Sequence, residues 1–237
     1  VTTDGSGNAS FSYTHAGSLS GFISASATED LGSGLFGSTS EFALTTSGVY
    51  TISGTVFEDV NFGGGAGRDL ATAAAAAPLF DIDAEGAVVE LYDTFGNFIA
   101  STTTDSSGLY SFDVAAGNYS IRVVNESVIS NRSGYSSALR AVQTYRTDAS
   151  SGSVVAVTDH VGGDTPNEID AAANSGSQTL AFLDTQTGFD VQSVSSISVS
   201  SANLSGLDFG FNFNTIVNTN DAGQGSLRQF ILNSNAL

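Results

Sequence analysis

The chain has 237 residues and a formal net charge of −18 at pH 7, from 24 acidic and six basic residues. All six basic residues are arginine, and lysine, cysteine, methionine and tryptophan are absent. So little positive charge argues against nucleic acid as a partner and against adsorption to anionic membranes. Disulfides, thiolate metal sites and Schiff-base chemistry are excluded. No apolar run approaches the roughly 20 residues that span a bilayer, so we expect no membrane insertion.

The first 48 residues predict three short strands, at 9–14, 21–28 and 41–46. Three short strands rarely form a stable domain alone. We therefore interpret 1–48 as a partial immunoglobulin-like β segment. It either packs on the rest of the chain, pairs with another chain or completes a sandwich.

From residue 49 the dominant sequence period is two, which is typical of strands with one buried face. We expect an antiparallel Greek-key β-sandwich over 49–213, with extra N-terminal strands before it. Within it, the alternation predicts that Tyr110 and Phe112 belong to the core. The alanine-rich segment 71–86 is expected to be irregular and exposed. The predicted strands of this domain lie at 50–57, 87–92, 98–103, 109–114, 119–125, 141–147, 154–158, 179–183, 191–200 and 207–213.

The polar segment 127–200 is expected to be a long insertion in this domain. Four arginines lie in or near its beginning, and in so acidic a chain we expect them to form salt bridges. They are Arg122, Arg132, Arg140 and Arg146.

The last segment, 214–237, is predicted to be a connector with one short helix. Ser226 and Gln229 have the spacing of a capping box, which marks a helix N-terminus. Leu227, Phe230 and Ile231 then form one apolar face. We expect this face to cover another surface.

Two stretches resemble a known family of surface domains. They read GTVFEDVNFGGGAGR at 54–68 and GAVVELYDTFGNFIASTTTDSSGLYSFDVAAGNYSIRVV at 86–124, and LDFGFNF at 207–213 resembles the closing strand of that family. The family is the B-type domain of serine–aspartate-repeat surface proteins, related to the collagen-adhesin B repeats. Segments 2–44 and 218–236 resemble the flanks of β-helix regions in large bacterial surface adhesins. The resemblance implies a prealbumin-like or immunoglobulin-like sandwich, calcium binding, a location at the bacterial cell surface and no catalysis.

Calcium is the cofactor that the residues favour, because closely spaced carboxylates and amides supply the oxygens that this ion requires. One partial loop, at 58–61, precedes a glycine-rich turn, and a second, at 81–86, follows the first half of an EF-hand pattern. The B-type domain family has one continuous calcium loop at this place, whereas in this chain an insertion at 69–80 separates the two halves. We expect the two halves to close around one ion. The predicted ligands are Glu58, Asp59, Asn61, Asp69, Asp81, Asp83 and Glu85.

The sequence gives little support to catalysis. It has no G-x-S-x-G elbow, and the two histidines, His15 and His160, lie in unrelated segments. We therefore predict a non-enzymatic, calcium-stabilised structural module of an extracellular bacterial surface protein. Strand and helix complementation between ends would allow its self-assembly into a filament. The alternative is an adhesin module that binds a glycan or a host or matrix protein, with Tyr135 and Tyr145 as candidate contacts.

Overall fold

The computed structural model describes residues 22–23, 26–32, 35–41, 45–46, 48–60, 62–77 and 81–237. The chain divides into two compact units, Val1–Gly48 and Val49–Leu237. In the first unit, β1 (Phe22–Ile23) pairs with β4 (Thr45–Thr46), and β2 (Ser26–Gly32) pairs with β3 (Leu35–Glu41). The strand predicted at 9–14 lies outside the described residues.

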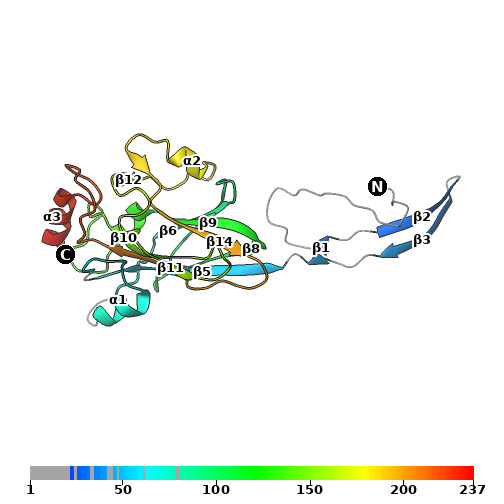
Figure 1. The fold of residues 1–237 in the computed structure, drawn as a ribbon, viewed down its shortest axis with the longest axis horizontal. Coiled ribbons are helices and arrows are strands. Elements are labelled where there is room, and N and C mark those ends of the chain that lie inside the picture. Colours follow the sequence, from blue (N-terminus) through cyan, green and yellow to red (C-terminus); the bar gives the residue numbers. More distant parts are fainter. Residues whose placement is uncertain are drawn as a thin grey trace. The chain divides into compact units, whose positions relative to one another are not determined.

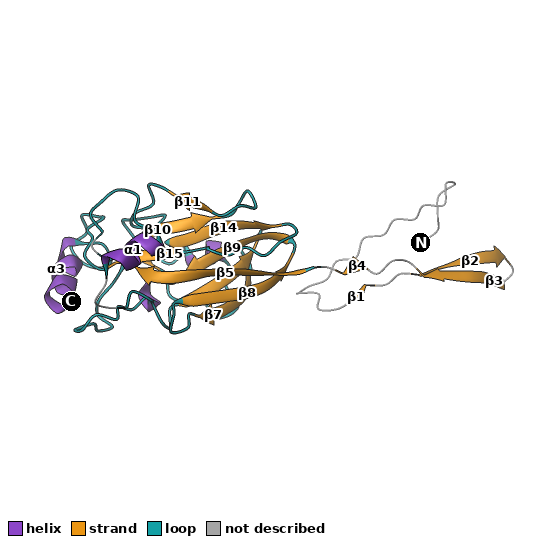
Figure 2. Ribbon diagram, turned by 90° about the horizontal axis from the view of Figure 1, so that it is seen from below, coloured by secondary structure: helices purple, strands orange, loops and turns teal. Residues whose placement is uncertain are grey.

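The second unit is a β-sandwich of two sheets (Figures 1 and 2). All strand pairs within these sheets are antiparallel except β5–β15, which is parallel. The predicted all-β sandwich with a short C-terminal helix is therefore confirmed. The five-stranded sheet has the order β11 (Val155–Val157), β10 (Val142–Asp148), β15 (Phe209–Asn212), β5 (Val49–Glu58) and β8 (Leu109–Ala115). The four-stranded sheet has the order β14 (Ser193–Val199), β9 (Gly117–Val123), β6 (Val88–Asp93) and β7 (Phe98–Thr103).

One apolar core lies between the two sheets. On β8, Tyr110 and Phe112 are buried, whereas Leu109 is 48% exposed, so the core prediction for the two aromatic residues is confirmed. Burial of each such side chain contributes roughly 1.5 to 3 kcal/mol. The hydroxyl of Tyr110 also donates to the carbonyl of Leu207 at 2.5 Å. This bond ties β8 to the segment that leads into β15.

The segment 127–200 contributes β10, β11 and β14 to the two sheets. A 3₁₀ turn, η1 (Asn125–Ser127), precedes it. The remainder forms the parallel pair β12 (Ile169–Asp170) and β13 (Phe189–Asp190), with the helix α2 (Leu180–Leu183) between them. The strand predicted at 179–183 is wrong, because Thr179 accepts a hydrogen bond from the amide of Phe182 and caps a helical turn.

The alanine-rich segment after Asp69 forms a helix, α1 (Leu70–Ala76), so the prediction of an irregular loop is wrong. Alanine has the highest helix propensity, and the Asp69 carboxylate caps the helix by accepting from the amide of Thr72 at 2.8 Å. Ala73 is buried in a small cluster that includes Phe57. Packing on the sandwich thus stabilises this short helix.

The C-terminal helix α3 (Leu227–Ala236) begins at the predicted capping residue, since Ser226 Oγ accepts from the amide of Gln229 at 3.1 Å. Two of the three residues of its predicted apolar face do not pack on the sandwich, and the expectation that this face covers another surface stays a prediction. Gln229 and Asn233 are the buried residues of α3, whereas Leu227 and Ile231 are exposed. Across the described residues, no helix has both the length and the apolar composition needed to cross a membrane.

Backbone carbonyls at the end of the sandwich explain this orientation of α3. Asn233 Nδ2 donates to the carbonyls of Arg140 at 2.8 Å and Phe213 at 2.6 Å. Gln229 Nε2 donates to the carbonyl of Ala138 at 3.0 Å. Carbonyls left unpaired in the interior would each cost about 1 to 3 kcal/mol. The helix face that carries Gln229 and Asn233 therefore packs against the sandwich. Both views place α3 at the end of the sandwich opposite to the start of β5 (Figures 1 and 2).

Candidate functional site

The first predicted calcium ligand, Glu58, is buried at the end of β5. Its Oε1 forms an ion pair with Arg132 Nη2, and its Oε2 accepts from Ser130 Oγ at 2.6 Å. Burial raises the pKa of Glu58, and the bonds from Ser130 and Arg132 oppose that shift. Both carboxylate oxygens are therefore occupied by protein donors.

The adjacent carboxylate, Asp59, is fully buried and also has an arginine partner. Arg68 Nε lies 2.7 Å from Asp59 Oδ1, while the amide of Arg68 donates to Oδ2 at 3.0 Å. Thr144 Oγ1 donates to the same Oδ2 at 2.9 Å. The glycine-rich turn thus returns the chain so that Arg68, which follows it, pairs with Asp59. Gly67 in this turn has φ +79°, and a Cβ there would lie 2.1 Å from the carbonyl oxygen of Thr144.

The other members of the first half have separate positions. Asp69 caps α1, and hydrogen bonds with Thr72 lower its pKa. Asn61 lies outside the described residues. The described members of this half are therefore not gathered into a metal-binding group.

The second half lies beside the end of β5. The amide of Glu58 donates to the carbonyl of Ile82 at 2.7 Å, so the backbones of the two halves do meet. The amide of Asp83 donates to Asp81 Oδ1 at 3.0 Å, and Glu85 is exposed. Burial, together with the negative charges of Asp81 and Asp105, raises the pKa of Asp83 to about 6.

Among the described residues, no three or more His, Cys, Asp or Glu side chains are grouped so as to hold a metal ion. Two of the predicted ligands are neutralised by arginines instead. The carboxylates of the predicted set that form no ion pair within the described part of the chain are Asp69, Asp81, Asp83 and Glu85. Calcium binding stays a prediction.

A buried ionic network lies between the four-stranded sheet and the β12 segment. Arg122 Nη1 lies 2.8 Å from Glu90 Oε2, and Nη2 lies 3.4 Å from Asp170 Oδ2. Tyr92 donates its hydroxyl to Glu90 at 2.5 Å. Burial raises the pKa of Asp170 to about 7, against the charge of Arg122. The four arginines predicted to form salt bridges all do so.

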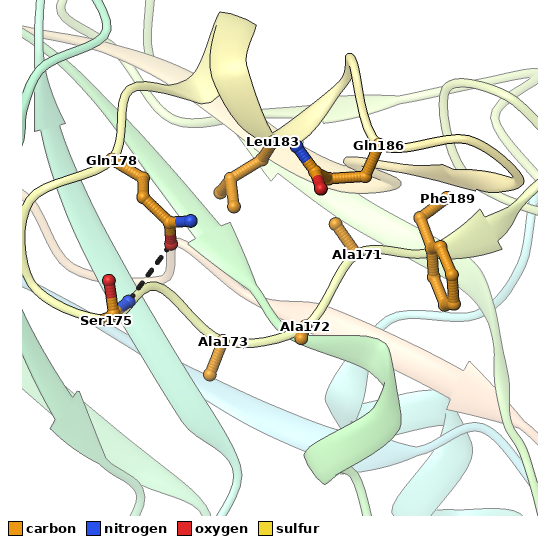
Figure 3. Close-up of a pocket in the computed structure, with 8 residues that line it drawn as sticks. All are labelled: Ala171, Ala172, Ala173, Ser175, Gln178, Leu183, Gln186 and Phe189. Carbon is orange, nitrogen blue, oxygen red and sulfur yellow. Dashed lines mark hydrogen bonds between the residues drawn. The ribbon is translucent and has the colours of Figure 1, made fainter.

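A pocket of about 360 Å³ lies over this network, between the segment after β12 and the segment from α2 to β13. In Figure 3, Phe189 stands at one end, and Gln178 and Ser175 stand at the other. No charged side chain lines it. The lining residues are Ala171, Ala172, Ala173, Ser175, Gln178, Leu183, Gln186 and Phe189. Sequence reasoning missed this pocket, because its two walls come from segments that only the fold brings together.

The two tyrosines considered as glycan contacts are partly buried against the sandwich. The ring of Tyr135 packs edge-on against Phe213, with centroids 5.9 Å apart. The ring of Tyr145 lies tilted against Phe57 at 6.1 Å. Both rings contribute to packing, which leaves them less surface for a ligand.

The comparisons with known proteins give limited similarity. No protein-family model matches the chain, and no curated protein matches it. One similar solved structure is the Bacillus anthracis TIE protein, with a TM-score of 0.31, 9% identity, and coverage of 78% of this chain and 24% of that one. Another is the T6 backbone pilin of Streptococcus pyogenes, described as modular and three-domained, with a TM-score of 0.29, 12% identity, and coverage of 73% and 36%. This chain thus spans about a quarter to a third of their lengths. At these TM-scores the likeness carries no argument about function.

Proposed function

We propose that this chain is a non-enzymatic structural module of an extracellular bacterial surface protein, and that it associates end to end with a second copy of itself through α3. The observation that carries the proposal is the outward apolar face of α3. Leu227, Ile231 and Leu232 are 56%, 49% and 52% exposed. Leu227 and Ile231 are four residues apart and therefore lie on the same helix face.

The exposed face is held in this orientation by the buried face of the same helix. The amides of Gln229 and Asn233 form hydrogen bonds with three carbonyls of the sandwich. If α3 rotated about its axis so that the apolar face packed on the sandwich, these carbonyls would be left unpaired, because apolar side chains cannot donate hydrogen bonds to them. Contiguous apolar surface on a protein marks a site of association. The helix thus presents a fixed apolar surface to a partner.

The position of α3 favours a linear arrangement. It lies at the end of the sandwich opposite to the start of β5 (Figure 1). A contact between this end and a different surface of the next copy is heterologous, and such contacts form open chains unless the rotation closes a ring. A surface filament has this geometry.

The interior charges support a structural role. Arg68, Arg122 and Arg132 each pair with a carboxylate that is at most 1% exposed. These groups tie segments of the sandwich together, and their hydrogen-bonding atoms point at each other. Catalytic carboxylates must instead face a substrate. The surface location is proposed from the resemblance to surface-protein domains and from the lack of oxidisable cysteine and methionine.

Light scattering on the purified chain tests the association. The molar mass is expected to rise with concentration for the wild type and to stay at the monomer value for the double variant Leu227→Asp, Ile231→Asp. Phe95→Asp is the matched control, because Phe95 is 83% exposed in the turn between β6 and β7. This control is expected to associate like the wild type. A wild type that remains a monomer at every concentration would contradict self-association through α3.

A second candidate function is adhesion through a small-molecule pocket. The pocket beside Phe189 favours it, because its volume lies within the roughly 300 to 1,000 Å³ typical of ligand sites.

A further inference from the structure

We propose that the pocket between Ala171–Ala173 and Phe189 binds one pyranose ring of a neutral saccharide. The proposal does not depend on the association of α3, because it concerns a different surface and different residues. The pocket residues also play no part in the predicted calcium loops.

The pocket combines an apolar base with an aromatic wall. Ala171 and Leu183 are buried and form apolar lining. Phe189 is 43% exposed, and in Figure 3 its ring stands at one end of the pocket. A pyranose has one face of C–H groups, and an aromatic ring is a suitable platform for such a face. The small alanine side chains leave room for a ring to lie flat.

The polar residues that line the pocket can form hydrogen bonds with the hydroxyl groups of a saccharide. Gln178 Oε1 accepts from the amide of Ser175 at 3.2 Å, which fixes that side chain (Figure 3). Within the described part of the chain, Gln178 Nε2, Gln186 Oε1 and Ser175 Oγ form no hydrogen bond. One donor, one acceptor and one hydroxyl on residues that line the pocket are therefore available to a ligand. Ligand sites of this kind are mostly apolar with a few placed polar groups.

The electrostatics select an uncharged ligand. No charged side chain lines the pocket. Behind the alanine segment, the single positive charge of Arg122 faces two carboxylates, Glu90 and Asp170. Asp184 and Asp190 lie close to each other in the segment that forms the opposite wall. Since the net charge of the chain is −18, an acidic sugar is repelled. A cationic ligand has no carboxylate in the lining to pair with.

The pocket is held in place before any ligand arrives. Arg122 donates to the carbonyls of Ala171 and Ala172, which fixes the alanine segment against the sheet. On the opposite side, Asp184 Oδ1 accepts from the amide of Val191 at 2.9 Å and secures the segment between α2 and β14. A preformed site avoids the entropic cost of ordering loops on binding.

Saturation-transfer NMR with the whole chain tests the proposal. The probes are the methyl glycosides of glucose, galactose, mannose and N-acetylglucosamine, with glucuronic acid and sialic acid as acidic probes. At least one neutral glycoside is expected to bind with a millimolar Kd, and the acidic probes are expected not to bind. Phe189→Ala is expected to weaken binding about tenfold. Because Phe189 is exposed, the variant is expected to keep the wild-type melting temperature.

Phe182→Ala is the matched control. Phe182 is 48% exposed on α2, in the same region, but does not line the pocket. This control is expected to bind like the wild type. Three results would overturn the proposal: no neutral glycoside binds, acidic probes bind more tightly, or the Phe189 variant binds as well as the wild type. Loss of binding in both variants would also overturn it, because the effect would not be specific to the pocket.

Discussion

Arg122 on β9 and Glu90 on β6 are register partners, and their side chains form a 2.8 Å ion pair with exposures of 0% and 1%. A buried ion pair is not in itself strongly stabilising, because removing both charges from water is costly. Removing one partner, however, leaves the other charge uncompensated. Asp170 makes this consequence more severe, since two carboxylates share one guanidinium.

Arg122→Ala is therefore expected to lower the free energy of unfolding by about 3 to 5 kcal/mol. Urea denaturation monitored by tyrosine fluorescence measures the change. Arg228→Ala is the control, because Arg228 pairs with Asp221 at the surface, where the side chains are 62% and 91% exposed. A surface pair contributes about 1 kcal/mol or less. Equal effects of the two substitutions would contradict the role of the buried network.

The pH dependence of the free energy of unfolding is expected to reflect the protonation of Asp83. Its folded-state pKa is raised from 3.8 to about 6 by burial and by Asp81 and Asp105. Between these two values the folded chain binds more protons at this site than the unfolded chain does. The contribution of Asp83 to stability is therefore full below about pH 4 and is lost as the pH rises through about 6.

Asp83→Asn removes the contribution of this carboxyl group to the pH dependence of stability. The stability of the variant relative to the wild type is expected to increase from pH 4 to pH 7, measured by urea denaturation across that range. Comparing the two proteins cancels the titrating groups that do not interact with Asp83, whereas Asp81 and Asp105 respond to the substitution together with it. A difference that does not change with pH would show that Asp83 has no raised pKa.

Calcium is expected to raise the melting temperature, because a cation near Asp81 and Asp83 relieves their mutual repulsion. Differential scanning calorimetry in calcium and in chelator measures the shift. The double variant Asp81→Asn, Asp83→Asn is expected to lose it. Magnesium is the control ion, since it demands a tighter octahedral geometry. Identical melting temperatures in calcium and chelator would show that the wild type lacks the predicted ion.

Gly67→Ala is expected to destabilise the chain by at least about 2 kcal/mol. The new methyl group would meet the carbonyl of Thr144 and disturb the turn that brings Arg68 to Asp59. Gly65→Ala is the matched control: Gly65 has φ +86° but open space around it, so only the backbone strain applies, about 1 to 2 kcal/mol. Thermal unfolding of both variants distinguishes the steric contribution from the conformational one.

The sequence predicted the strands well because alternation is a local property. The residues of β8 alternate between exposed and buried and those of β7 between half-buried and exposed, and their predicted bounds agree with the structure to within one residue. The helix α1 was missed although its signals were local too. Asp69 is a capping residue, and the alanine run that follows has a high helix propensity.

The site was harder to predict because the partners of its carboxylates are not evident from spacing. Glu58 and Asp59 are adjacent in the sequence and were expected to face one ion, but Arg132 reaches Glu58 from a distant segment and Arg68 reaches Asp59 across the glycine-rich turn. Likewise, the apolar pattern of α3 predicted a face that covers another surface, but it did not predict which face of the helix packs on the sandwich. The carbonyls that Asn233 satisfies belong to residues far away in the sequence, and they hold the face with the amide side chains inward.

The parallel pairing of β5 and β15 has a mechanical consequence. The register runs from Val56 with Phe209 to Glu58 with Phe211. Tension that pulls the start of β5 and the end of β15 in opposite directions acts along the strands, so the hydrogen bonds of this pair are loaded in shear together. Antiparallel hairpins pulled from their open ends separate one bond at a time. The β5–β15 pair therefore gives the sandwich resistance to stretching along its length.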